Sequence, residues 1–381
     1  MIFDYVTLKL IWLLLIGFLW IAFAVTGGFD LGVAVLLPFL GKTDDERRVI
    51  LNSIGPTWEG NQVWLITAAG AIFAAWPMVY ATFFSSLYFA LLILLFALIL
   101  RPPGIDYRSK LPSLAWRQFW DWSLFVSGFV PLLLFGVAFG HLFLGLPFYF
   151  DDTLRSFYTG DFLSLLRPFP LLTGVMGLSL LSMHGALFLQ LKTPSTSAIQ
   201  KRAIFSARLF GMLFFICFLA AFFWIIKVLP GYRLVSIPDI NTSFSPLVKQ
   251  VSVATGAWMN NFERFPTGWL APLFVFLGVI FALFFSAFRK AGYAMIFSAA
   301  AICAVIVTGG FILFPFILPS SSIPNHSLTI WDACSSYLTL SWMFWAVMIL
   351  CPIVISYTIW VYRVMRGKVE DSTHLKSSEY Y

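Results

Sequence analysis

Long stretches of apolar residues, separated by short polar segments, are the feature that most limits how this chain of 381 residues can fold. The chain is 60% hydrophobic and only 11% charged, whereas soluble domains carry about 25% charged residues. In lipid only helices and closed barrels satisfy the backbone, and the apolar runs are too long and continuous for barrel strands. The sequence therefore predicts an all-α integral membrane protein.

Nine apolar runs approach the roughly 20 residues that a helix needs to cross a bilayer. They cover residues 8–30, 60–77, 80–100, 121–144, 169–190, 205–227, 268–288, 293–317 and 340–362. We expect a single transmembrane helical domain over residues 1–370, followed by a polar cytoplasmic tail at 371–381. The start of the chain lacks the basic segment of a cleavable signal peptide, so we expect the first run to remain as a span.

The basic residues of the loops sort to alternate sides of these nine predicted spans. Most of the 24 Lys and Arg residues fall on one side, which also holds the C-terminal end. Because basic loops stay in the cytoplasm, we expect the N-terminus outside and the C-terminus in the cytoplasm. The net charge of +7 then reflects membrane topology rather than a nucleic-acid partner.

Cysteine and histidine residues give no sign of a metal or haem site on this chain. No two of the four Cys have a C-x-x-C spacing, so we expect free thiols. His141 and His184 fall toward opposite faces of the membrane and cannot bind one haem together; we expect them to hydrogen-bond between helices. His326 falls in an outer loop and His374 in the tail.

Asp30 interrupts an apolar run, and a carboxylate inside a span is costly and usually functional. Counted from the outer end of the first span, it should lie near the cytoplasmic edge of the hydrocarbon core. Glu59 begins the second span and Arg101 ends the third on that same side. The predicted topology therefore brings Asp30, Glu59 and Arg101 to a similar depth, where they could hold or pass a proton or cation.

Each of these polar residues also has a simpler interpretation. Asp30 could turn toward headgroup water, and Glu59 could be an ordinary acid facing the positive end of a helix dipole. Arg101 could extend to the membrane surface as an anchor. Residues 61–62 could form unspecific hydrogen bonds between helices, and the segment 106–108 could be a solvated turn.

Five sequence motifs, spread over most of the chain, agree in order and spacing with one known family. They are AVTGGFDLG at 24–32, GNQVWLITA at 60–68 with FAAWPM at 73–78, RP at 101–102 with DYRSK at 106–110, FPFILPSS at 314–321, and WDA at 331–333. Together they resemble subunit II of cytochrome bd-type quinol oxidases.

The resemblance implies a haem-free subunit that pairs with a haem-bearing subunit I, often with a small single-span accessory subunit, in the bacterial cytoplasmic (inner) membrane. Such a complex oxidises quinol and reduces dioxygen to water in the aerobic respiratory chain, with haem b and haem d in subunit I. The family's second subunit is also associated with a structurally bound ubiquinone and with part of the cytoplasmic proton path. The carboxylates of that path map onto Asp30 and Glu59, with Arg101 near them.

Two positions depart from the family pattern. Family members commonly have Asp where this chain has Gly27, and Asp where it has Glu59. The second change keeps a carboxylate with a longer reach, whereas the first removes one, so that water or Asp30 would carry that step. From the residues alone two other functions stay open: a proton- or ion-coupled transporter that uses the same carboxylates, and a scaffold that only stabilises the haem subunit.

Overall fold

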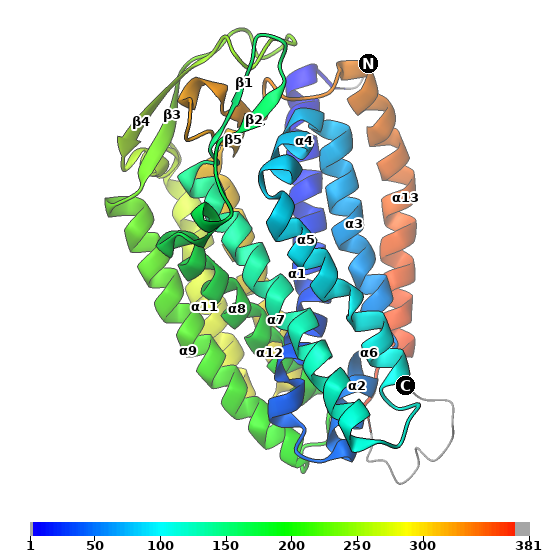
Figure 1. The fold of residues 1–381 in the computed structure, drawn as a ribbon. Helices are drawn as coiled ribbons and strands as arrows, with labels where there is room; N and C mark the ends of the chain where they lie inside the picture. The colour runs from blue at the N-terminus through cyan, green and yellow to red at the C-terminus, as the bar shows by residue number, and fades with distance from the viewer. Residues whose placement is uncertain (1–2, 370–381) are drawn as a thin grey trace.

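Helices form along every long apolar run in the computed structural model, which describes residues 3–369 (Figure 1). The helices are α1 (Tyr5–Leu40), α2 (Asp44–Ile54), α3 (Trp58–Ala75), α4 (Pro77–Ser86), α5 (Tyr88–Ile99), α6 (Arg101–Tyr107), α7 (Leu114–Leu144), α8 (Pro168–Lys192), α9 (Ala198–Lys227), α10 (Asn260–Arg264), α11 (Leu270–Ala287), α12 (Ala291–Leu313) and α13 (Tyr337–Val364). The tail predicted at 371–381 lies outside the described residues.

Eight helical segments of the described chain are long and apolar enough to cross a membrane. They are Tyr5–Leu40, Tyr88–Tyr107, Leu114–Leu144, Pro168–Lys192, Ala198–Lys227, Pro266–Ala287, Ala291–Leu313 and Tyr337–Val364. The all-helical prediction is thus confirmed. The run predicted at 60–77 forms α3, a helix of 18 residues with Glu59, Asn61 and Gln62 in its first turns, and it is not among the eight.

Two predicted boundaries were wrong by eight residues or more. The first span was expected to end at residue 30, but α1 continues without a break to Leu40. The third was expected at 80–100, but Pro77 starts the separate helix α4, and the spanning helix begins only at Tyr88. Proline favours the first turn of a helix because its missing N–H has no partner there.

Three small antiparallel sheets lie at the end of the bundle where α1 begins (Figure 1). They pair β1 (Phe148–Phe150) with β2 (Ser156–Tyr158), β3 (Pro230–Ser236) with β4 (Gln250–Thr255), and β5 (Phe316–Leu318) with β6 (Leu328–Thr329). The short 3-10 helices are η1 (Leu163–Leu166), η2 (Ala257–Met259), η3 (Pro266–Trp269) and η4 (Pro324–His326).

Buried lysines fasten these loops to α1 and to one another. Lys9 of α1 is fully buried, and its Nζ donates to the backbone oxygens of Ile240 and Trp331, each at 2.9 Å. Lys249 and Asp332 form a buried ion pair at 2.8 Å. Because the ammonium groups of both lysines are bonded to loop residues, the loops form an ordered cap over this end of the bundle.

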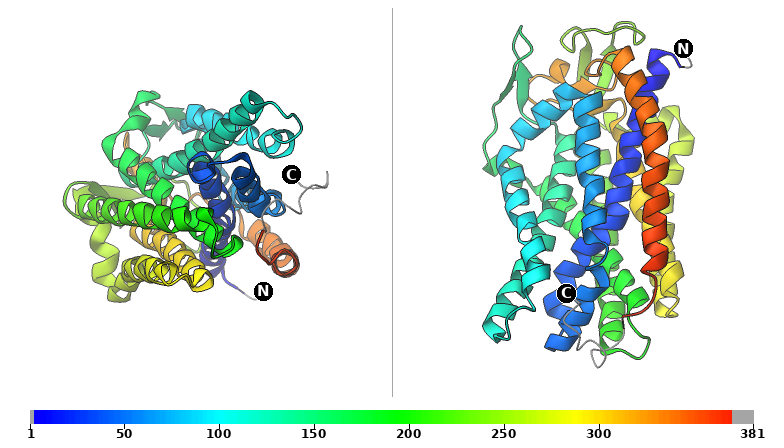
Figure 2. Two further views of the ribbon diagram at one scale, coloured as in Figure 1. Left: turned by 90° about the horizontal axis from the view of Figure 1, so that it is seen from below. Right: turned by 90° about the vertical axis from the view of Figure 1, so that its right-hand side faces the viewer.

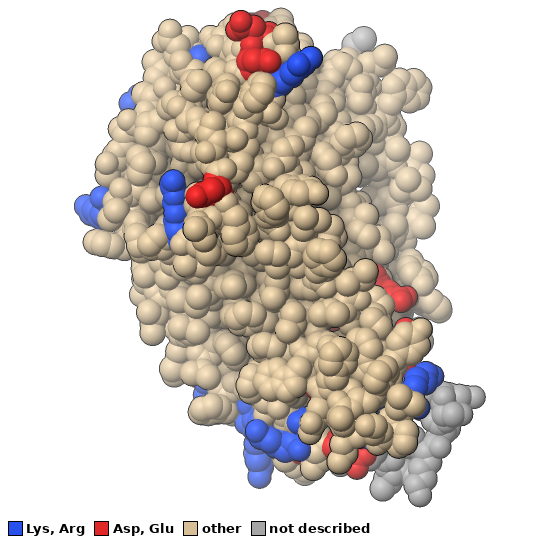
Figure 3. Space-filling model, viewed as in Figure 1, with Lys and Arg blue, Asp and Glu red and all other residues tan. Residues whose placement is uncertain are grey.

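Helix α1 lies inside the bundle, against α3, α7 and α8, while α13 lies at its edge (Figure 2). Glycines permit this close packing. A Cβ at Gly32 would lie 2.1 Å from the carbonyl oxygen of Leu181, and one at Gly128 would lie 2.5 Å from that of Leu31. Small residues let helix backbones touch, which is a main source of helix association in lipid. The face drawn in Figure 3 is mostly uncharged between the two ends of the bundle.

Candidate functional site

Asp30 lies within α1 and its side chain is completely buried. The Asn61 amide nitrogen donates a hydrogen bond of 2.7 Å to Asp30 Oδ2, and the Tyr362 hydroxyl donates one of 2.7 Å to Asn61 Oδ1. These residues come from α1, α3 and α13, so the site exists only once the bundle has assembled.

Arg101, the first residue of α6, supplies the opposite charge. It is 2% exposed, and its Nη2 lies 3.8 Å from Asp30 Oδ2. Its Nη1 donates to Gln62 Oε1 at 3.3 Å, and its guanidinium lies 5.3 Å from the centre of the Trp58 ring. The guanidinium therefore favours a charged Asp30 by proximity, without a close hydrogen bond to it. Asp30, Asn61, Gln62, Arg101 and Tyr362 are called the Asp30 cluster below.

Part of the hydrogen-bonding capacity of this cluster is unused by the protein. Asp30 Oδ1 and the Nε and Nη2 atoms of Arg101 have no hydrogen-bond partner among the described protein atoms. Buried polar atoms are normally paired, with water where protein groups do not reach. Oδ1 can therefore take up a proton, or bond to a water molecule, while Oδ2 keeps its bond from Asn61.

The predicted proximity of Asp30 and Arg101 is confirmed, and the simpler interpretation of each is wrong. Asp30 does not reach headgroup water, because it is fully buried and α1 runs ten residues further, to Leu40. Those residues add about 15 Å of helix. Arg101 does not extend to the surface, because it is buried against Asp30.

Glu59 lies near the cluster in sequence, but its side chain is directed away from it. It is an exposed acid in the first turn of α3, and none of the described ion pairs involves it. Its neighbours Trp58 and Asn61 are buried and contact the cluster. Glu59 is therefore at a similar depth to Asp30, as predicted, but on the outer surface of the chain.

Gly27, where the resemblance leads one to expect a carboxylate, faces the same region. A Cβ there would lie 2.6 Å from Phe23 Cε2 and 3.6 Å from the backbone oxygen of Asn61. The Phe23 ring thus occupies the space that a side chain at position 27 would need, and this part of the region is apolar in this chain.

The neighbours of Asp30 carry only weak functional signals in the sequence. Asn61 and Gln62 carried only an unspecific signal, because polar residues bond between helices in many bundles. Tyr362 carried none, because an aromatic residue near the end of a span is typical of the membrane interface. Its role depends on α13 lying beside α3, which no local pattern reveals.

His184 bonds between helices, as predicted, whereas His141 bonds a carbonyl of the 3-10 segment η1. His141 Nε2 lies 3.0 Å from the backbone oxygen of Leu165. His184 Nε2 lies 3.0 Å from the backbone oxygen of Val25, and its Nδ1 lies 2.6 Å from Ser298 Oγ. A haem-ligating imidazole needs a nitrogen free for iron; both nitrogens of His184 are bonded to protein groups, so this ring is not arranged to hold haem. The four cysteines are free thiols.

Two spaces between helices of the described chain differ in size and lining, and they bear on the expected quinone. A cavity of about 30 Å³ between α7, α8, α9 and α12 holds little more than a water molecule. A groove of about 320 Å³ between the start of the chain and α13 is lined almost wholly by apolar groups, including Phe3, Leu338, Trp342 and Trp345. Neither lining includes a residue of the Asp30 cluster.

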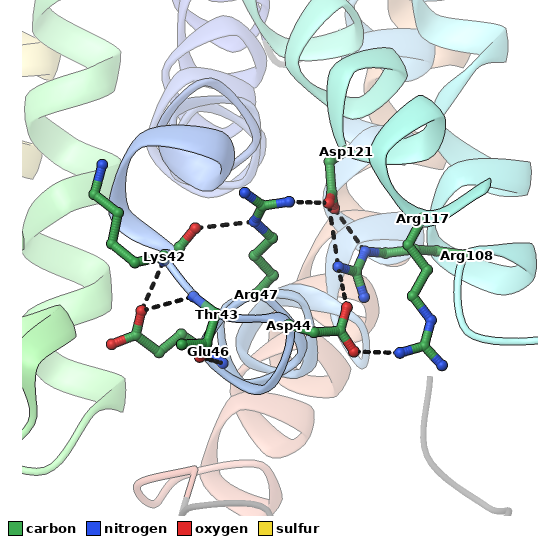
Figure 4. A network of polar contacts seen from close by, with 9 residues as sticks. Lys42, Thr43, Asp44, Glu46, Arg47, Arg108, Arg117 and Asp121 are labelled. Carbon is green, nitrogen blue, oxygen red and sulfur yellow. Dashed lines mark hydrogen bonds and ion pairs between the residues drawn. The ribbon is translucent and has the colours of Figure 1, made fainter. Parts of the chain in front are cut away.

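A second group of charged residues lies at the other end of the bundle from the strands (Figure 4). Arg108 bonds Asp121 Oδ1 at 2.6 Å and Asp44 Oδ1 at 2.8 Å. Arg47 bonds Asp121 Oδ2 at 2.7 Å, and Arg117 bonds Asp44. These five residues are called the Arg108 cluster below. The interpretation of segment 106–108 as a solvated turn is wrong at Arg108, which is 1% exposed.

Comparisons with known proteins point to one family. The family model of cytochrome bd terminal oxidase subunit II matches residues 8–365. The chain is 44% identical over 376 residues to cytochrome bd-I ubiquinol oxidase subunit 2 of Escherichia coli (strain K12), covering 97% of this chain and 99% of that protein. It is 47% identical over 370 residues to the probable cytochrome oxidase subunit 2 of Haemophilus influenzae, covering 96% of each.

The fold is also found in a solved structure. A chain of the bd oxidase from Geobacillus thermodenitrificans superposes with a TM-score of 0.66 at 13% identity, covering 95% of this chain and 100% of that one. At this low identity the likeness concerns the arrangement of the helices alone.

Proposed function

We propose that the Asp30 cluster of this chain carries protons from the cytoplasm toward the haem-bearing partner subunit. The premise is that the chain belongs to the cytochrome bd terminal oxidase subunit II family and is a subunit of a cytochrome bd ubiquinol oxidase complex. Family membership sets aside the alternative of an ion-coupled transporter. In the complex the partner's haem b and haem d supply the electron chemistry that reduces dioxygen to water.

One observation carries the proposal: Asp30 is completely buried, yet one of its two carboxylate oxygens has no hydrogen-bond partner among the described protein atoms. Burial disfavours a charged carboxylate, while Arg101, 3.8 Å away, favours it. These opposing influences let Asp30 be charged or neutral at modest cost. The Asn61 amide does not itself pass protons; it holds Oδ2 in place while Oδ1 gains and loses one.

Glu59 indicates where the partner binds. It is exposed beside Val63 and Ile66, which are 52% and 68% exposed on the same helix. Lipid cannot solvate a carboxylate, so a residue of this kind faces a partner or a water-filled path. Helix α13 is also little covered, since Leu340 is its only buried residue. We assign the outer face of α3, with α13, to the contact with subunit I, and Glu59 to the proton path at that contact.

The same assignment makes α3 a ninth span. Helix α1 begins at the end of the bundle with the strands, and α13 ends at the opposite end (Figure 1). An odd number of crossings agrees with this, and the basic loops favour the cytoplasm for the end that holds the Arg108 cluster. The proposed location is the bacterial cytoplasmic membrane. A small single-span accessory subunit and a bound ubiquinone remain part of the proposal by family analogy alone.

Asp30→Asn and Asp30→Glu in the purified complex test the proton role. Oxygen reduction with excess quinol and proton uptake from the cytoplasmic side would be measured, with haem spectra as the control for assembly. We expect both rates to fall in Asp30→Asn and to recover partly in Asp30→Glu. Normal rates in Asp30→Asn, with normal haem content, would leave this chain the role of a scaffold.

A further inference from the structure

His184 is a fully buried ionisable residue that the proposed proton path does not use. It lies on α8, and its ring bonds both the Val25 carbonyl of α1 and the Ser298 hydroxyl of α12. One side chain thus joins three helices, and the residue that it bonds on α1, Val25, lies five positions before Asp30.

The hydrogen-bond partners determine which nitrogen of the ring carries hydrogen. The Val25 carbonyl can only accept, so His184 Nε2 must donate. In a neutral ring Nδ1 then accepts from the Ser298 hydroxyl, at 2.6 Å. If Ser298 instead donated to the Met295 carbonyl, 3.1 Å away, the ring would have to be charged. No carboxylate of residues 3–369 bonds to the ring, so the neutral form satisfies both nitrogens at the lower cost.

The segment of α1 around Asp30 is held against α8 from several directions. The Phe29 ring stacks on Phe188 of α8 at 3.9 Å and lies 6.2 Å from the His184 ring. A Cβ at Gly185 would lie 2.6 Å from the backbone of Gly32. Successive helical residues point about 100° apart, so fixing Phe29 toward α8 turns Asp30 away from α8.

The groups that face Asp30 come from other helices. They are Asn61 of α3, Arg101 of α6 and, through Asn61, Tyr362 of α13. The Tyr362 ring also lies 6.5 Å from that of Phe29. Small rotations of α1 about its axis would change the distance from Asp30 to Asn61 and to Arg101, because both contacts lie on one side of α1.

We propose that His184 is a positioning residue: through its bond to the Val25 carbonyl and its contact with Phe29, it sets the rotation of α1 that aims Asp30 at Asn61 and Arg101. This rests on the proposed proton role only for its effect on turnover; the effect on Asp30 itself is independent. Ser298 fixes the ring by donating to Nδ1.

The test uses the purified complex with normal haem content. His184→Leu removes both hydrogen bonds at similar volume, whereas His184→Gln keeps a donor for Val25 and an acceptor for Ser298. Redox-difference infrared spectra would follow the carboxyl band of Asp30, identified by its loss in Asp30→Asn. We expect the band to shift in His184→Leu, with oxygen reduction falling by about tenfold, since misplacing a reacting group by about 1 Å can cost a hundredfold. His184→Gln should restore both.

The outcomes separate the two proposals. An unshifted Asp30 band in His184→Leu, or no recovery in His184→Gln, would overturn the positioning role. A shifted band with an unchanged rate would support positioning and count against the proton role of Asp30. If His184→Leu does not assemble, Ser298→Ala removes only the donor to the ring; it should shift the band less and in the same direction, and an unshifted band there would overturn the proposal.

Discussion

The Asp30 cluster and the Arg108 cluster both bring arginines and aspartates together, but they differ in how fully those charges are bonded. In the Arg108 cluster, Asp121 accepts from two arginines at 2.6 and 2.7 Å. In the Asp30 cluster the single arginine lies 3.8 Å from the carboxylate. One oxygen of that carboxylate accepts no hydrogen bond from the described protein atoms. The aspartate at the centre of each cluster, Asp121 or Asp30, is buried, so burial alone does not distinguish the two clusters.

The difference shows which kind of charged site can change its protonation. A carboxylate that accepts several charge-assisted hydrogen bonds stays ionised, and its bonds join the elements that supply them. Burial alone would lower the pKa of Arg108, but its bonds with Asp121 and the charges of Asp121 and Asp44 outweigh burial and raise it. The Arg108 cluster thus acts as a clamp that joins α2 to α7. In the Asp30 cluster, by contrast, one Asp30 oxygen has no partner among the described protein atoms and can take up a proton.

The largest expected contrast is between the matched variants Asp30→Asn and Asp121→Asn. Loss of a group that transfers protons costs about a hundredfold or more, so we expect a loss of that order in oxygen reduction per haem for Asp30→Asn. Asp121→Asn should reduce the yield of assembled complex but leave the rate per haem within about twofold of wild type. Equal rate losses in the two variants would remove the distinction between clamp and path.

Next in size are the two arginines. Arg108→Gln leaves the buried carboxylate of Asp121 and the partly exposed one of Asp44 short of a partner, and we expect a loss of about 3 kcal/mol in stability. Arg101→Gln should destabilise less, because Asp30 can become neutral by taking up a proton. Thermal loss of the haem signal in detergent would measure both. A larger loss for Arg101→Gln would mean that the Asp30 cluster is the more important structural contact.

A smaller effect is expected for Glu59→Gln. Its side chain is exposed and unpaired within the described chain, so other groups or water at the proposed subunit contact can share its role. We predict a fall of several-fold in oxygen reduction, well short of that for Asp30→Asn, with normal haem content. Glu263→Gln, at an exposed acid of α10 outside the Asp30 cluster, is the matched control.

The smallest expected effect is on the stability of the fold in acid, through Glu46 of α2, next to Arg47 of the Arg108 cluster. Burial raises the pKa of Glu46, but hydrogen bonds from Arg202 and from the backbone N–H groups of Lys42 and Thr43 outweigh it, so the pKa is lowered. A lowered pKa means that Glu46 stabilises the fold above its unfolded value of about 4.3, and that this is lost as pH falls through the folded value.

Glu46→Gln should therefore reduce thermal stability slightly near neutral pH and weaken its decline in acid. The measurement is the inactivation temperature of the complex from neutral pH to about pH 3, below the ordinary pKa of a carboxyl. Asp45→Asn, on the same turn of α2, provides the control. An acid decline as steep as in wild type would show that Glu46 is not responsible for it.

The helices were predictable because lipid imposes a simple rule on long apolar runs. The short helix α2 was not predicted, although Thr43 and Glu46 form a capping box that is visible in sequence. The end of α1 was misplaced at Asp30 because the first span was given only the length that a helix needs to cross a bilayer. Asn61 and Arg101 offset the cost of burying Asp30, so the helix continues unbroken past it.

The residues that complete the site depend on longer-range packing. Tyr362 is 301 positions from Asn61, to which it donates a hydrogen bond of 2.7 Å. Glu59 has the residue type expected for the path, but its place on the α3 surface puts its side chain outside the cluster. A shift of one residue turns a helix by about 100° and so changes which side chains are buried. Sequence periodicity in a lipid-facing bundle is too weak to determine that rotation.

By itself the sequence determined that this chain is a bundle of membrane helices and which family the chain resembles, and it predicted a similar depth for Asp30 and Arg101. Only the tertiary structure decided that Asp30 is fully buried, that it is held by Asn61, which Tyr362 bonds in turn, and that Glu59 is exposed. The physical reason is that apolar length is a local property, whereas a hydrogen bond needs two atoms within about 3 Å. Helix packing at contacts such as Gly32 against Leu181 sets those distances.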